Sequence, residues 1–97
     1  MKKNTKKKFY KFYLVEYNGE QEYSWTMGCW ATTEKVAIKK ARTYAKHWYD
    51  SYEGKPKEIQ ENVFSFAGIG IEVGLDFSGE YDFEEFKKEL VDKAILA

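Results

Sequence analysis

Apolar residues, many of them aromatic, dominate residues 9–17 and 22–31, and Asn18-Gly19 separates the two stretches. Both stretches are rich in aromatic and β-branched residues, a pattern typical of strands. Asn-Gly favours a tight turn because both residues accept positive φ angles. The sequence therefore predicts a β-hairpin over residues 9–31.

The length of this turn sets which side chains face each other across the hairpin. A two-residue turn would give the following pairs on the two faces: Leu14 with Tyr23, Phe12 with Trp25 and Tyr10 with Met27; Val15 with Glu22, Tyr13 with Ser24 and Lys11 with Thr26. A four-residue turn would keep both faces, whereas a three-residue turn would invert one strand relative to the other. Aromatic side chains lie on both faces in the predicted register, so a single core cannot account for all of them.

A helical period follows the hairpin. Thr32 or Thr33 is suited to begin a helix, with Glu34 in its first turn, and the pattern continues to about Tyr49 or Tyr52. Its predicted inner stripe is Ala37, Ala41, Tyr44, Ala45, Trp48 and Tyr52, and its opposite stripe is basic, Lys35, Lys39, Arg42 and Lys46.

Residues 53–61, which include Pro56, predict a loop. Residues 63–77 alternate apolar side chains with glycine or acid, and predict either one bent strand or two strands joined near residues 68–70. Ser78-Gly79 predicts a turn. Asp82 and Glu85 form a capping-box pattern for a second helix over residues 83–95, with an inner face of Phe83, Phe86, Leu90 and Ala94.

The element order is thus β-β-α-β(-β)-α. It predicts a small single-domain α+β fold, with two helices and an antiparallel sheet of three to four strands. The length of 97 residues fits one domain, residues 9–97. Residues 1–8 include five lysines and predict a flexible basic arm.

Composition excludes several classes of function. No apolar run approaches the ~20 residues of a membrane span, so no membrane partner is expected. Cys29 is the single cysteine and cannot form an internal disulfide, which favours a reducing cytoplasm. His47 is the single histidine and cannot build a zinc site with one cysteine. With no catalytic, metal or cofactor pattern, we expect a non-enzymatic protein without a cofactor.

The hairpin supplies the first candidate site, for binding a protein. The chain has eighteen aromatic residues, and aromatic side chains with polar tips are favoured at interfaces. The candidate residues are Phe9, Tyr13, Val15, Tyr17 and Trp30. A protein partner or a second copy in a homodimer would cover them, unless the second helix does so. Residues 30–38 resemble the strand-to-helix joint of many small bacterial and phage proteins, and this resemblance implies local structure only. The small size, the solubility, the lack of catalytic patterns and the aromatic density suit, by weak analogy, a phage or mobile-element accessory protein that inhibits a host factor.

The second candidate site is for nucleic acid. Net charge is zero, but residues 1–60 carry +6 and residues 61–97 carry −6. The lysine arm and the basic helix stripe could contact phosphates, through Lys6, Lys7, Lys8, Lys35, Lys39, Arg42 and Lys46. The same stripe also fits an ordinary solvated helix face, and the hairpin lacks the RNA-recognition motif.

Overall fold

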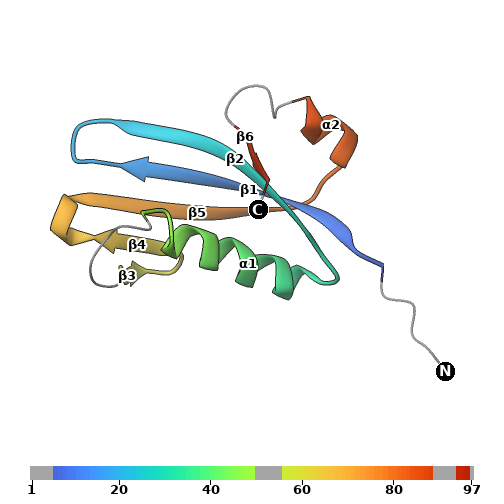
Figure 1. Cartoon of the computed structure of the whole chain (residues 1–97), viewed down its shortest axis with the longest axis horizontal. Helices are drawn as coiled ribbons and strands as arrows, with labels where there is room; N and C mark the ends of the chain where they lie inside the picture. The colour runs from blue at the N-terminus through green and yellow to red at the C-terminus, as the bar shows by residue number, and fades with distance from the viewer. Residues whose placement is uncertain (1–5, 50–55, 89–93, 97) are drawn as a thin grey trace.

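The structure is a computed structural model that describes residues 6–49, 56–88 and 94–96. Within them the chain forms one mixed sheet, in the strand order β3-β4-β5-β1-β2-β6, with two helices (Figure 1). The strands are β1 (Lys8–Tyr17), β2 (Glu22–Ala31), β3 (Lys57–Gln60), β4 (Val63–Phe66), β5 (Ile71–Glu80) and β6 (Ala94–Leu96). The helices are α1 (Glu34–Lys46) and α2 (Phe83–Lys87), and a 3₁₀ turn, Ala67–Ile69, joins β4 to β5. The fold is therefore a small α+β domain, as predicted.

The β1–β2 hairpin turns over four residues, Asn18–Gln21, instead of the predicted two. The Asn18 side-chain oxygen accepts hydrogen bonds from the backbone N–H groups of Glu20 and Gln21, at 3.0 and 2.8 Å, which stabilises this wider turn. The predicted pairs are therefore wrong by two residues, and the observed pairs include Leu14 with Trp25, Phe12 with Met27 and Tyr13 with Thr26. A shift of two residues keeps each side chain on its face, so the two predicted faces are correct.

The prediction of three to four antiparallel strands is only partly right, because the sheet has six strands in the described part of the chain and the pairing of β2 with β6 is parallel. β3 lies in the predicted loop, where Asn62 at φ 62° closes a turn of two residues between Gln60 and Val63. β6 lies in the predicted second helix and pairs in parallel with β2. α2 spans five residues, and Asp82 caps it by accepting a hydrogen bond from the Glu84 N–H at 2.8 Å. Pairing with a sheet edge overrides local helix preference for Ala94–Leu96, and Leu90 falls outside the described residues.

Residues 63–77 form two strands, one of the two predicted alternatives, and β5 continues through the predicted turn at Ser78-Gly79 to Glu80. A bulge lies there instead, since the β1–β5 register shifts between Lys11 and Phe12. β1 thus has a partner strand on both sides along most of its length.

The main core lies between the sheet and α1. Ala37, Ala41 and Ala45 are fully buried, and their small side chains bring the helix close to the sheet. The Thr33 side chain caps α1 as predicted, accepting from the Val36 N–H at 3.2 Å. Tyr44, expected to face inward, is exposed instead, and Tyr52 lies outside the described residues. Neither helix is long and apolar enough to cross a membrane.

Candidate protein-binding face

The sheet has an outer face, which is the side turned away from α1. Alternate residues of β1 lie on it: Phe9, Lys11, Tyr13, Val15 and Tyr17. The structure divides this face into two regions. One end is covered by α2, and the other carries exposed tyrosines.

The covered end is an aromatic group that we call the α2 cluster, made of Phe9, Trp30, Phe83 and Phe86. The ring of Phe9 lies 4.9–5.2 Å from the other three, measured between centroids, and only 4% of the residue is exposed. Phe9 is therefore part of the fold, which corrects its prediction as a surface contact. Trp30 remains 37% exposed at the rim of the cluster.

Gly28 makes this cluster possible. A Cβ atom at this position would lie 2.1 Å from a ring carbon of Phe9 and 3.0 Å from one of Phe86. The ring of Phe9 thus fills the space that a side chain on β2 would take. At Gly74, by contrast, the nearest atom to such a Cβ would be a methyl carbon of Val63 at 3.9 Å.

The exposed end is a tyrosine strip, Tyr13, Val15 and Tyr17 on β1. Tyr13 is 45% exposed and Tyr17 is 42% exposed, whereas Val15 between them is half-buried. Beside Val15 the sheet carries Ser24 on one side and Gly74, then Val63, on the other. The structure thus keeps three of the five predicted protein-binding residues together. The surface between the two tyrosines carries smaller side chains, some of them apolar.

Carboxylates flank both tyrosines. In the sheet register Tyr17 lies between Glu22 on β2 and Glu72 on β5, and Tyr13 lies beside Asp76 on β5. The three acidic residues are exposed, and they form no ion pair with any residue that the structure describes. Sequence reasoning missed them as site residues because it paired Glu22 with Val15 instead of Tyr17, and because it gave the strand that carries Glu72 and Asp76 no partner strand.

Lys11 lies at the boundary between the two regions. Its ammonium group is 4.1 Å from the ring centroid of Tyr81 and 5.2 Å from that of Tyr13, and the residue is 8% exposed. An ammonium group over a tyrosine ring is attracted by the negative face of the ring. Tyr13 thus already takes part in recognising a cation within the fold.

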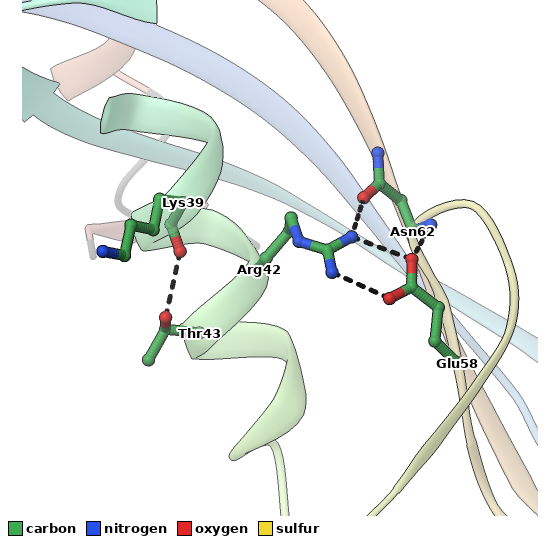
Figure 2. Close-up of polar contacts among 5 residues, drawn as sticks. All are labelled: Lys39, Arg42, Thr43, Glu58 and Asn62. Atoms are coloured by element: carbon green, nitrogen blue, oxygen red, sulfur yellow. Dashed lines mark hydrogen bonds and ion pairs between the residues drawn. The ribbon is translucent and has the colours of Figure 1, made fainter. Parts of the chain in front are cut away.

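The predicted basic stripe of α1 is partly engaged by the fold. Figure 2 shows Arg42 reaching from α1 to the β3–β4 turn, where it donates to both carboxylate oxygens of Glu58 at 2.7 and 2.8 Å and to the Asn62 side-chain oxygen at 2.6 Å. Hydrogen bonds from Arg42 and the Asn62 backbone hold the pKa of Glu58 at about 2. Lys35, Lys39 and Lys46 are exposed on the same helix.

Lys6, Lys7 and Lys8 are exposed as well. Lys8 is the first residue of β1 and pairs with Ala31, so these lysines lie next to the joint between β2 and α1. The Lys8 Nζ also lies 3.7 Å from the Glu80 Oε1 in an exposed ion pair. The structure thus brings these three lysines near the start of the basic helix stripe.

The residues considered for chemistry show no reactive arrangement. Cys29 is buried on the inner face, and burial raises the pKa of its thiol. His47 ends α1 with its Nδ1 2.8 Å from the Thr43 carbonyl oxygen. Among the described residues, no three histidine, cysteine or acidic side chains converge as metal ligands would.

A shallow hollow of about 510 Å³ lies along the outward side of α1. Its described lining comes from this one helix and includes Val36, Tyr44 and His47. Val36 and Tyr44 are each a little over a third exposed, which makes this surface a useful comparison for the tyrosine strip.

Searches against known protein families, curated proteins and solved structures give no match for this chain. Its function is therefore argued from the arrangement of its own residues.

Proposed function

We propose that this chain is a non-enzymatic binding protein that docks a protein partner on the tyrosine strip, with Trp30 at the far end of the same face. The observation that carries the proposal is the exposure of Tyr13 and Tyr17, at 45% and 42%, on one face of a central strand. Tyrosine offers a large contact area with few rotatable bonds, so little entropy is lost when a partner orders it.

The position of β1 determines the mode of binding. Its backbone is hydrogen-bonded to β2 on one side and to β5 on the other, so a partner cannot add to it as a strand. Contact must come from side chains that project from a sheet already fixed in place. This arrangement favours a preformed surface that changes little on binding.

The test compares two pairs of substitutions in capture experiments from a lysate of the source organism. Tyr13→Ala with Tyr17→Ala removes the strip, and Val36→Ala with Tyr44→Ala removes side chains of similar exposure on α1. We expect the first variant to lose a partner that the second variant keeps. If the first variant has an unchanged circular dichroism spectrum and melting temperature yet keeps every partner, the proposed site is wrong.

A role as a phage or mobile-element accessory protein that inhibits a host factor would fit this mode of binding, by analogy alone. Identifying the captured partner decides this point. A partner from the chain's own genome, in place of a host enzyme or factor, would contradict it.

Nucleic-acid binding is the second candidate, and the pairing of Lys8 with Ala31 favours it. This pairing brings Lys8 toward the start of α1, where Lys35 lies, and the two would share one basic surface, although Arg42 is held by Glu58. A salt titration with mixed oligonucleotides tests it, because each phosphate contact to a single strand changes the logarithm of affinity by about 0.7 per decade of salt. Absence of binding at low salt would exclude this function.

A further inference from the structure

The charge around the tyrosine strip indicates what kind of partner fits it. Cross-strand neighbours on one face of a sheet have Cβ atoms about 4.5–5.5 Å apart, which places Glu22 and Glu72 beside Tyr17 and Asp76 beside Tyr13. Each tyrosine therefore has a carboxylate within reach of any group that contacts its ring. We propose that the partner presents a positively charged, extended polypeptide segment to this face, an inference that rests on the proposed function.

The fold contains an example of the same recognition. Lys11 directs its ammonium group at the rings of Tyr13 and Tyr81, 5.2 and 4.1 Å from their centroids. Tyrosine rings attract cations, and nearby carboxylates add a second attraction of the same sign. An arginine side chain suits both groups, because its planar guanidinium stacks on a ring and donates to a carboxylate.

The same charges disfavour nucleic acid on this face. A base stacked on Tyr13 or Tyr17 would bring its phosphates close to Asp76, Glu72 and Glu22, and like charges at short range repel. The exposed lysines of α1 lie on the opposite side of the sheet. Basic peptide and nucleic acid would therefore bind different surfaces of the molecule.

The spacing of the strip predicts the spacing of the partner's side chains. Tyr13 and Tyr17 are four residues apart on one strand, a distance of about 13 Å. An extended segment has the same rise, so its residues i, i+2 and i+4 would face Tyr13, Val15 and Tyr17. Each outer residue of the segment would contact a tyrosine ring and a neighbouring carboxylate, and the middle residue would contact Val15 and Gly74. The preferred pattern is basic–x–apolar–x–basic.

Synthetic peptides test this pattern directly. The probe is Ser-Arg-Ser-Leu-Ser-Arg-Ser, compared with a peptide of the same composition in which the arginines are adjacent and with one in which glutamate replaces arginine. Binding is followed at low salt by amide chemical-shift changes in the full chain. We expect the spaced peptide to bind most tightly, with shifts confined to residues 13–17, 22–26 and 72–76.

Two triple variants separate local charge from net charge. Glu22→Gln, Glu72→Gln and Asp76→Asn should weaken binding of the spaced peptide about tenfold, since each exposed ion pair contributes a few-fold in affinity. The control, Glu34→Gln, Glu61→Gln and Glu84→Gln, changes net charge equally at positions outside the tyrosine strip and should leave binding unchanged. Equal binding of the rearranged peptide, equal loss in both variants, or no binding at about 1 mM peptide would overturn the inference.

Failure of the inference is distinct from failure of the proposed function. If Tyr13→Ala with Tyr17→Ala loses the captured partner while the outer-face carboxylate variant keeps it, the strip is a docking site but the partner is not basic. If neither variant loses the partner, the docking site itself is wrong.

Discussion

At the scale of single residues, Gly28 determines whether Phe9 can pack onto the sheet. The ring of Phe9 occupies the position of a Cβ atom at residue 28, and it also contacts Trp30, Phe83 and Phe86. Any larger residue must displace that ring, because the backbone of β2 is fixed by β1. One missing methyl group thus allows α2 to cover the end of the outer face.

Gly28→Ala should therefore destabilise the chain, by about 1–3 kcal/mol, the usual cost of adding a methyl group to a filled core. Gly74→Ala is the matched control, since it also lies on the outer face of a strand but its Cβ would meet nothing closer than 3.9 Å. Urea unfolding followed by circular dichroism compares the two. Equal midpoints for both variants would show that Phe9 moves aside at no cost.

The burial of Phe9 also shows what the sequence could and could not reveal at this scale. Alternation placed Phe9 on the same face as Tyr13 and Tyr17, and this is correct. Only tertiary structure shows that α2 covers Phe9 and stops short of Tyr13, because the position of α2 depends on contacts with β1 and β2, which are distant in the sequence.

At the scale of elements, one ion pair joins α1 to the β3–β4 hairpin. Arg42 binds both oxygens of Glu58, and Glu58 also accepts from the Asn62 N–H at 2.8 Å (Figure 2). Asn62 has a positive φ of 62°, and its carbonyl accepts from the Leu75 N–H at 2.9 Å. The turn is thus held by the helix on one side and by β5 on the other.

This ion pair predicts acid sensitivity. The pKa of Glu58 is lowered to about 2, mainly by its hydrogen bond with Arg42, from an ordinary value of 4.5. A lowered pKa in the folded state stabilises the protein above pH 4.5, and this contribution is lost as the pH falls from 4.5 to 2. Glu58→Gln should therefore be less stable at neutral pH and lose less stability on acidification than the unmodified chain.

Glu61→Gln is the control for this prediction, because Glu61 occupies the same turn without bonding to Arg42 through its side chain. Thermal melts at several pH values between neutrality and pH 2 compare the three proteins. If Glu58→Gln and Glu61→Gln show the same pH profile, the ion pair does not stabilise the fold.

The end of α1 is attached in a similar way and predicts sensitivity to alkali. Glu16 on β1 accepts a hydrogen bond from the Trp48 indole at 2.7 Å, and burial together with a hydrogen bond to Glu16 raises the pKa of Tyr49 from 10 to about 12. A raised pKa stabilises the fold below pH 10, and this is lost as the pH rises from 10 to 12. Tyr49→Phe should lose less stability than the unmodified chain over that interval. Tyr17→Phe, which replaces an exposed tyrosine, is the control and should lose as much stability as the unmodified chain.

The two elements that were not predicted have a common cause. A turn of two residues joins β3 to β4. Residues Lys57–Gln60 of β3 carry little strand signal, and they pair with β4 because Arg42 and Asn62 hold them there. β6 lies in a segment whose sequence predicts a helix, but it forms a strand that pairs with β2. Both depend on contacts from other elements, whereas the hairpin and α1 carry their own signals of alternation, turn and cap.

At the scale of the whole molecule, the two helices divide the aromatic residues between two cores. α1 covers the inner face along much of the sheet, and α2 covers one end of the outer face (Figure 1). Among the described residues six aromatic side chains are buried, whereas Tyr13 and Tyr17 stay exposed, as do Tyr23, Trp30 and Tyr44. If α2 were lifted from the sheet, Phe9 and Trp30 would be uncovered on the same face as the tyrosine strip, with Lys11 between the two regions.

Removing the α2 side of the cluster should therefore make the chain associate with itself. Phe83→Ser with Phe86→Ser uncovers Phe9 and Trp30, and an exposed apolar patch of this kind promotes association. Light scattering after size-exclusion chromatography should show a larger, concentration-dependent mass than that of the unmodified chain. Adding Tyr13→Ser and Tyr17→Ser should reduce that mass if the two regions act as one surface. Association that persists at full strength would mean that Phe9 and Trp30 drive it without the tyrosine strip.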